Sequence, residues 1–506
     1  MRLWRMLIVV SLTLLLALGA LAPLASSAAD PQPGTAAWAE QILASPYAVR
    51  LSGMGETALL RMAGRLRPVS LPRDANGAAL GFGPAAPNAP LNVRVNNADP
   101  SGPTCATQSE THVLDAGGNK LVAGFNNSRF ACSSGDYTGY AVSTDGGATW
   151  SDKSPPPLGG LDTFGDPVLA KDRAGNVYLA NLSDQGVSVH KMTAGSTSFG
   201  VGVDADPGTT GFADKEWLAI GPNPSNLSQD YIYVAWLDFG FFNNVFRMSR
   251  STNGGASFQA LSSFAFTCNN CQGIFLAVDP NTGKIYAFYE DFISSGSNRA
   301  IRYKESTDGG NTWSGIRTAA NITDSTPHTA CGRETFNFTS ASRAVRNSEF
   351  PSAVVTSTGL VAVTWNDGRN GTSDIYGTFS TNGGATWRAP LRVNVNTANH
   401  QFQPSVTADS RGVHLFWYSG NTTTNQVTTQ ARSYLFASGW TAESQISSVA
   451  FPVQQTNPNS DTAIADCYWG DYNQISANGT VTHYTWGDTR NLIGGQNQPD
   501  VFYAKQ

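Results

Sequence analysis

Short apolar runs recur in pairs along most of the chain, and a turn rich in Gly, Asp or Asn separates the two members of each pair. The runs are rich in β-branched and aromatic residues, which suit a pleated, half-buried surface. The paired runs are 111–115 with 121–125, 166–170 with 176–180, 216–220 with 231–236, 274–278 with 284–289, 351–355 with 360–365, 404–408 with 413–417, and 472–475 with 481–486. Each pair of runs indicates the first two strands of a unit. Seven such units, each completed to four short strands, predict an all-β chain folded as a seven-bladed β-propeller.

An octet of the form Ser-Thr-Asp/Asn-Gly-Gly-x-Thr/Ser-Trp/Phe occurs four times. The copies are Ser143–Trp150, Ser251–Phe258, Ser306–Trp313 and Ser380–Trp387. The two glycines can supply the positive φ angles of a hairpin turn, and the closing aromatic ring can pack on a neighbouring strand. The octet resembles the Asp-box, or bacterial neuraminidase (BNR) repeat, of sialidase-like β-propellers. In that family the box closes the hairpin between the two outer strands of a blade, which implies a structural role.

The two ends of the repeated region complement each other. The last unit stops at its third strand, Val501–Tyr503, with no outer strand left to follow. The segment Pro90–Asn96 closely copies Pro390–Asn396, which follows the fourth octet as an outer strand. We therefore expect the N-terminal strand to complete the last unit, which would remove two exposed sheet edges.

The first residues predict export. Arg2 and Arg5 precede an apolar run over 7–24, and small residues at 25–29 follow. This order is typical of a secretory signal peptide over 1–29, cut near Ala28 or Ala29; an uncleaved membrane anchor is the alternative. Residues 30–90 are weakly helical at first and then rich in Pro, Ala and Gly, so we interpret them as a pro-like or capping extension and linker. The propeller would occupy residues 91–506 of a secreted protein that no longer contacts a membrane.

Composition narrows the range of partners. Only 14% of the residues are charged and the net charge is −5, which argues against nucleic acid and anionic membranes. The six cysteines of an exported chain favour disulfides over metal. Cys268 and Cys271 can form a local bridge, and the pairs Cys105–Cys132 and Cys331–Cys467 would complete the set, although the spacing leaves the connectivity open. We expect a monomer without a cofactor or a metal site; a structural calcium ion is the alternative.

Acidic residues concentrate on two sets of loops that a propeller brings to one mouth of its central channel. The candidates for general acids or bases are Asp166, Asp214, Glu216 and Asp471, because glycoside cleavage needs two carboxylates that flank the bond. Tyr472 joins them as a candidate catalytic residue. Trp469 could stack on a sugar ring, or pack with its neighbours around Cys467. Each carboxylate could also be a turn or loop cap.

A second motif places three arginines at equivalent positions. Trp365–Arg369 recurs as Trp486–Arg490, and more loosely as Phe125–Arg129. Arg129, Arg369 and Arg490 could together clamp a substrate carboxylate through bidentate hydrogen bonds. Alternatively, each Arg could pair with the Asp of its own loop, which the repetition of the motif favours.

Residues 91–506 resemble the sialidase superfamily through the octets and the repeated strand pairs. In sialidases an Arg triad holds the substrate carboxylate, a Tyr paired with a Glu is the nucleophile, and an Asp is the acid. The chain departs from that pattern because it lacks an Arg-Ile-Pro motif before the first octet, and because sialidases have six blades, which makes six the alternative count. The resemblance implies an exported sialidase-like glycoside hydrolase; the alternative is a non-catalytic propeller that binds glycan or protein at the cell surface.

Overall fold

The computed structural model describes residues 31–66, 83–98, 103–184, 186–207, 209, 211–240, 242–292, 299–493 and 495–506. The predicted signal peptide and most of the predicted linker lie outside these residues. Strands account for 48% of the chain and helices for 7%, so the expectation of a mainly β fold is confirmed. Among the described helices, none has both the length and the apolar character needed to cross a membrane.

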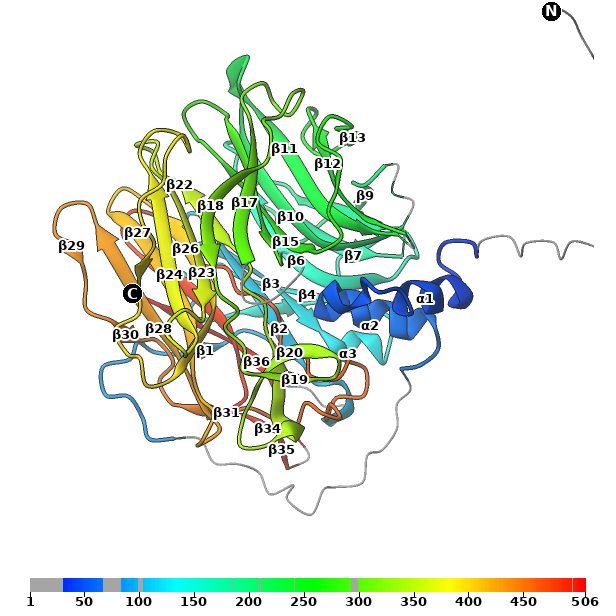
Figure 1. Cartoon of the computed structure of the whole chain (residues 1–506), viewed down its shortest axis with the longest axis vertical. Coiled ribbons are helices and arrows are strands. Elements are labelled where there is room, and N and C mark those ends of the chain that lie inside the picture. The colour runs from blue at the N-terminus through cyan, green and yellow to red at the C-terminus, as the bar shows by residue number, and fades with distance from the viewer. Residues whose placement is uncertain are drawn as a thin grey trace, which may run out of the picture.

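The described strands form seven sheets of four or more strands (Figure 1). The first four sheets are β2 (Gln108–Gly117), β3 (Lys120–Asn127), β4 (Thr138–Ser143) and β5 (Ser151–Lys153); β6 (Thr163–Lys171), β7 (Val177–Ser183), β8 (Gly186–Met192) and β9 (Val203–Asp204); β10 (Phe212–Asn223), β11 (Asn226–Phe239), β12 (Asn244–Ser251), β13 (Gln259–Ala260) and β14 (Phe266–Thr267); and β15 (Cys271–Val278), β16 (Ile285–Asp291), β17 (Arg299–Ser306) and β18 (Arg317–Ile322).

The remaining three large sheets follow in chain order. They are β22 (Ser352–Val355), β23 (Val361–Asp367), β24 (Asp374–Ser380) and β25 (Leu391–Arg392); β26 (His400–Ala408), β27 (Gly412–Asn421), β28 (Gln426–Leu435), β29 (Gly439–Trp440), β30 (Ser444–Gln445) and β31 (Phe451–Pro452); and β32 (Ser476–Ala477), β33 (Thr482–Asp488), β36 (Asp500–Lys505) and β1 (Val93–Arg94). Two small sheets are inserted between them: β19 (His328–Ala330), β20 (Arg333–Asn337) and β21 (Ala344–Arg346), and the hairpin β34 (Leu492–Ile493) with β35 (Gln496–Asn497).

The first strands of the large sheets contact one another in order. β2 contacts β6, β6 contacts β10, and the series continues through β15, β22, β26 and β32, which in turn contacts β2. These strands are buried along most of their length, including the polar residues near one end of β2, β6 and β10. A parallel bridge between His112 and Gln474 joins the first sheet directly to the segment before β32.

The N-terminal strand completes the last sheet, as the sequence predicted. β1 pairs with β36, with Arg94 opposite Phe502, just as Arg392 of β25 lies opposite Tyr376 of β24. Asn96 and Asn394 also correspond, since each accepts a hydrogen bond from the neighbouring strand, at 2.8 Å from Val501 N and from Ile375 N respectively. Asn96 thus corresponds to Asn394 in the structure, whereas the similarity of the two segments matched it with Asn396. The structural correspondence is shifted by two residues.

All four octets have the same internal hydrogen bonds. Ser306 Oγ accepts from Gly310 N at 2.9 Å, and Asp308 accepts from Thr312 N at 2.9 Å. The equivalent bonds recur in the other three copies. Each octet follows the third strand of its sheet and precedes the fourth, and its second glycine has a positive φ. The octets thus close the hairpins between the third and fourth strands, away from the first strand of each sheet.

We expect Trp387→Ala to lower the free energy of unfolding by about 2–3 kcal/mol, less than for a fully buried aromatic because the ring is half-buried. Trp387 packs on Phe288 and Tyr303 and donates a hydrogen bond to the Tyr303 hydroxyl at 3.2 Å. Thr381→Ala, at an exposed neighbour, is the control and should change little. Urea unfolding measures both, and a Trp387→Ala variant as stable as the control would contradict a structural role.

The three disulfides are Cys105–Cys132, Cys268–Cys271 and Cys331–Cys467. They confirm the proposed pairs. The third joins the turn between β19 and β20 to the loop before residue 471, so it holds the small inserted sheet beside the first strands.

The N-terminal extension contains two helices within residues 31–66, where the sequence predicted weakly helical structure. Helices α1 (Ala36–Leu43) and α2 (Gly53–Met62) begin at the capping side chains of Thr35 and Ser52. Their apolar residues are buried in the main core: Trp38, Ala39, Ile42, Leu51, Met54, Ala58 and Leu59. In Figure 1 both helices lie against the sheets of the N-terminal half. The extension therefore covers one end of the first strands β6 and β10.

Candidate functional site

Five of the first strands contain a bulge near the same end. The register shifts between residues 109 and 112, 165 and 168, 214 and 217, 272 and 275, and 402 and 405. A bulge sets two residues against one and redirects their side chains. Glu110, Asp166, Lys215 and Gln403 have positive φ angles at these bulges, a conformation that costs side-chain-bearing residues energy. Such outliers at buried polar residues are typical of functional sites.

These bulges gather five carboxyl groups, which we call the carboxyl cluster: Glu110, Asp166, Asp214, Glu216 and Asp471. The first four are at most 1% exposed, and the Asp471 side chain is 7% exposed. They come from three neighbouring sheets and from the segment before β32. Burying several like charges together is costly, so the cluster must hold protons or pair with cations.

Glu110 and Asp166 influence each other's pKa within the cluster. The interaction with Asp166 raises the pKa of Glu110, whereas the interaction with Glu110 opposes the rise in the pKa of Asp166, so a proton is favoured on Glu110. Burial raises the pKa of both groups, and for Glu110 the nearby charges of Asp166 and Asp471 raise the pKa further. Glu110 also accepts a hydrogen bond from Asp471 N at 2.9 Å.

Asp214 and Glu216 lie on either side of the Lys215 bulge in β10. Burial, and then the charge of Asp166, raises the pKa of Asp214 to about 7 and that of Glu216 well above its usual value. Within the described part of the chain, neither Glu216 carboxyl oxygen receives a hydrogen bond from another residue. A buried carboxyl whose pKa is raised in this way, and whose oxygens are left without hydrogen-bond donors in the described residues, suits the role of a general acid.

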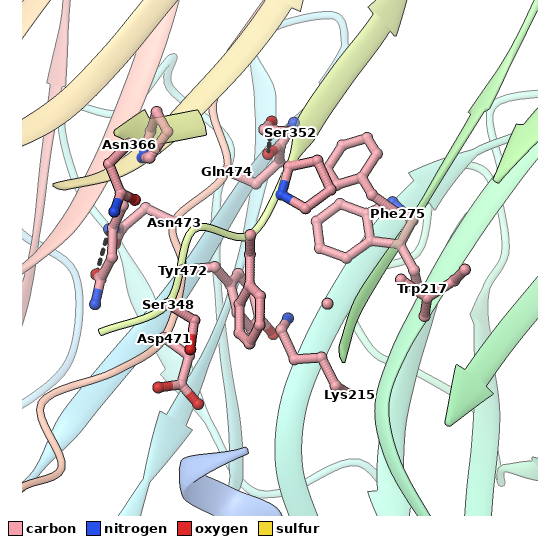
Figure 2. Close-up of a pocket in the computed structure, with 16 residues that line it drawn as sticks. Lys215, Trp217, Phe275, Ser348, Ser352, Asn366, Asp471, Tyr472, Asn473 and Gln474 are labelled. Atoms are coloured by element: carbon pink, nitrogen blue, oxygen red, sulfur yellow. Dashed lines mark hydrogen bonds between the residues drawn. The ribbon is translucent and has the colours of Figure 1, made fainter. Parts of the chain in front are cut away.

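Lys215 and Tyr472 line a small pocket together with Asp471 of the cluster (Figure 2). The Lys215 Nζ is 3.5 Å from the centre of the Tyr472 ring, and the Tyr472 hydroxyl donates to Pro167 O at 3.1 Å. The edge of Trp217 meets the same ring. Burial raises the pKa of Tyr472 well above its usual value, with further contributions from Glu110, Asp166 and Glu216. A cavity of about 20 Å³, lined by these residues and Asp471, leaves room for about one water.

Two arginines of the inserted sheet face the cluster, and the sequence did not point to either. Arg346 contacts Asp471 at 3.3 Å, and both Arg346 and Arg333 bind the Glu56 carboxylate of α2, at 3.0 and 2.9 Å. Arg346 and Arg333 lie at the edge of a second cavity of about 40 Å³. An arginine pair of this kind binds carboxylates well.

The predicted arginine triad is not assembled, because each member pairs locally. Arg369 binds Asp367 through Nε at 2.9 Å, and Arg490 binds Asp488 through Nε at 2.9 Å. Arg129 lies 3.6 Å from Asp152. Throughout the described ranges, no recorded contact links these arginines to the carboxyl cluster. The contacts of Arg369 and Arg490 fit the alternative in which each Arg pairs with the Asp of its own loop, whereas Arg129 lies near Asp152 of β5.

Of the other predicted site residues, the structure brings Asp166, Glu216, Asp471 and Tyr472 together. Trp469 is 4% exposed and packs among Phe402, Tyr418 and Phe451 in the core, so it cannot stack on a sugar in this conformation. The position of Trp469 fits the alternative in which it packs with its neighbours.

A second acidic group surrounds Arg299. Its guanidinium binds Glu290 at 3.2 Å and Asp324 at 2.9 Å, and also binds Glu334 and Glu349. The oxygens of Asp324, Glu334 and Glu349 lie close enough together to ligate an ion. Because Arg299 already supplies the positive charge there, these residues do not fit a calcium site well.

We expect the stability of the chain to fall as the pH rises from about 6.5 to about 8. This range lies above the one in which buried histidines with lowered pKa values, such as His112 and His190, act in the opposite direction. Burial raises the pKa of Asp206, which lies outside the carboxyl cluster, to about 8, and that of Asp214 to about 7. Between the unfolded and folded pKa values the unfolded chain loses protons that the folded chain keeps. Each such group therefore costs up to about 1.4 kcal/mol of stability per pH unit in that window.

Urea unfolding from pH 4 to pH 9 measures this dependence. Asp206→Asn should flatten the curve between about pH 6.5 and pH 8, and Asp214→Asn between about pH 6.5 and pH 7. A chain whose stability increases with pH throughout that range would contradict the raised pKa values.

Comparisons with known proteins find similar solved structures only. No family model and no curated protein match the chain. An α-L-arabinofuranosidase from Fusarium graminearum has 11% identity over 84% of this chain and 98% of its own, with a TM-score of 0.41. A sialidase from Streptococcus pneumoniae has 10% identity over 82% and 70%, with a TM-score of 0.38. A six-bladed fucose-binding lectin from Aleuria aurantia has 11% identity over 67% and 96%, with a TM-score of 0.40. The identities and TM-scores are low, and we draw no conclusion about function from them.

Proposed function

We propose that this chain is an exported, sialidase-like glycoside hydrolase that acts on glycans at the carboxyl cluster. The observation that carries the proposal is the gathering of five buried carboxyl groups around Lys215 and Tyr472. Cleavage of a glycosidic bond needs one carboxyl that donates a proton and another that is charged. Glu216, with its raised pKa and lack of partners, suits the proton donor. Asp471, in an ion pair with Arg346, suits the charged group.

Arg333 and Arg346 suggest the substrate class. Both already hold one carboxylate, that of Glu56. We propose that they hold the carboxylate of an acidic sugar in the complex, in place of the triad that the repeated motif suggested. Glu110 would hold a proton against Asp166, and Tyr472, whose hydroxyl is held by Pro167 O, would lie beside the sugar.

We also propose that the seven large sheets are the blades of one propeller over 91–506, and that the octets are its Asp-boxes. The contacts of the first strands in chain order, with β32 beside β2, support one closed ring. The position of each octet between the third and fourth strands supports the second assignment. The closed ring fits a monomer, and the three disulfides fit an oxidising compartment outside the cell.

The proposal is tested by a screen on fluorogenic sialosides, glucuronides and arabinofuranosides, and on polysaccharides that include polygalacturonate. Because α2 covers the cluster, the chain is assayed intact and after cleavage at a protease site inserted between residues 66 and 83. Hydrolysis that Glu216→Gln abolishes would support the proposal. Hydrolysis unaffected by Glu216→Gln would contradict it.

A non-catalytic glycan-binding propeller is the second candidate. The local pairing of Arg129, Arg369 and Arg490 favours it, since the expected catalytic clamp is absent from their positions. Calorimetric binding of a screened glycan without turnover, equally strong in Glu216→Gln, would establish this function instead.

A further inference from the structure

The start of α2 occupies the carboxyl cluster as a ligand would. Ser52 N donates to Asp214 at 2.7 Å, and Gly53 N donates to Asp471 at 2.7 Å. The Ser52 hydroxyl also binds Asp214 and reaches Asp166 at 3.2 Å. The positive end of the helix dipole therefore faces the acidic groups, which stabilises this arrangement.

Glu56, one turn further along the helix, adds a negatively charged carboxylate to the donors at the start of the helix. It binds Arg333 and Arg346, which are 277 and 290 positions away in the sequence. The helix thus offers donors to the acidic groups and a carboxylate to the basic groups, which matches the charges of the site on both sides.

Gly53 and Gly55 lie so close to neighbouring residues of the site that neither position has room for a side chain. A Cβ added to Gly53 would lie 2.0 Å from the Tyr468 ring, and one added to Gly55 would lie 2.2 Å from Asp214 Oδ1. Ala favours a helix more than Gly does, so helix formation alone would select Ala at these positions. The absence of side chains at 53 and 55 is explained by docking against the cluster.

The space that remains beside the helix is too small for a sugar. The two cavities measure about 20 and 40 Å³, whereas ligand pockets usually measure roughly 300–1,000 Å³. Leu51, Ser52 and Met54 are at most 4% exposed, so the segment seals the cluster from solvent.

We propose that residues 48–56 are an internal inhibitor, which imitates an acidic ligand and blocks the carboxyl cluster until the segment 31–66 is released. The tether gives the segment a high effective concentration, which a free glycan cannot match; cutting the chain between residues 66 and 83 removes that advantage. The identity of the excluded ligand rests on the proposed function, but the blockage rests on the contacts above.

The test uses the full chain with a protease site between residues 66 and 83, cut after purification. Release of the 31–66 fragment on dilution is followed by size exclusion with mass detection, and hydrogen exchange is measured over 212–217 and 468–474. We expect Glu56→Gln and Gly53→Ala each to weaken retention of the fragment at least tenfold. The matched control is Glu40→Gln, at a half-exposed carboxylate that lies 3.6 Å from Arg65 of the same segment.

After release, exchange over both stretches should accelerate while the melting transition of the sheets persists. Binding of N-acetylneuraminate or glucuronate should then be detectable by calorimetry in the cut chain and undetectable in the intact chain. Release and faster exchange without binding of either sugar would sustain the blockage and count against the proposed function. Release that occurs only as the sheets unfold, or equal retention of the Glu56→Gln and Glu40→Gln fragments, would overturn the inference.

Discussion

Replacement of residues 91–96 by a Gly-Ser sequence of equal length should lower the free energy of unfolding by about 4–6 kcal/mol. Val95 is 2% exposed, and its burial contributes about 1.5–3 kcal/mol. Asn96 accepts from Val501 N and donates to Asp500, each at 2.8 Å, and the replacement removes both of these side-chain bonds. Each of these bonds adds about 0.5–1.5 kcal/mol. The loss is a large fraction of the stability of an ordinary domain.

Chemical denaturation of the two chains measures this loss. Leu91→Ser is the matched control, because Leu91 lies in the same segment but is 82% exposed. It should leave the unfolding midpoint unchanged. A replaced chain that unfolds at the same denaturant concentration as the control would show that β1 does not complete the last sheet in solution.

Glu216→Gln should lower kcat/KM on a substrate found in the screen by roughly 10²–10⁴-fold, the range for loss of a general acid. The same variant should be more stable than the natural chain at pH 7, because it removes a buried carboxyl whose pKa burial has raised. Opposite changes in activity and stability are expected of a residue kept for chemistry, whereas loss of a structural residue would lower both.

Asp206→Asn provides the control for this prediction. Asp206 is also a buried carboxyl with a raised pKa, near 8, but it lies at Val187 in the second sheet, outside the carboxyl cluster. It should gain stability at neutral pH without losing activity. Equal losses of activity in both variants would remove the evidence that Glu216 has a catalytic role.

The strands of the large sheets could be predicted from the sequence because the patterns that mark them are local. Alternating apolar runs, turn glycines and the octets each lie within about ten residues, and they predicted six of the strand pairs closely. The first strand of the seventh unit was less accurate, since only Ser476–Ala477 is a strand there. Residues 472–475 instead pack beside the first sheet, through the bridge from Gln474 to His112.

The site was predicted only in part, for a physical reason. Asp166 and Glu216 could be placed in the candidate site because they lie in recognisable strands, and Asp471 and Tyr472 because they lie at the start of the predicted seventh unit. The repetition of Asp and Arg in one motif favoured pairing within each loop over a substrate clamp. Arg369 and Arg490 do pair with the Asp of their own loops. In contrast, the contacts of Glu56 with Arg333 and Arg346 span more than half of the chain. No local pattern records such a pairing, which only the closed arrangement of sheets creates.

The most direct test of the proposed site is a crystal structure of the cut chain, freed of residues 31–66 and soaked with sialyllactose or an oligogalacturonate. We predict sugar density within hydrogen-bonding distance of Glu216 and Asp471, with the sugar carboxylate on Arg333 and Arg346 where Glu56 lay. A sugar bound at the outer strands or the octets, with the carboxyl cluster left to solvent, would contradict the account.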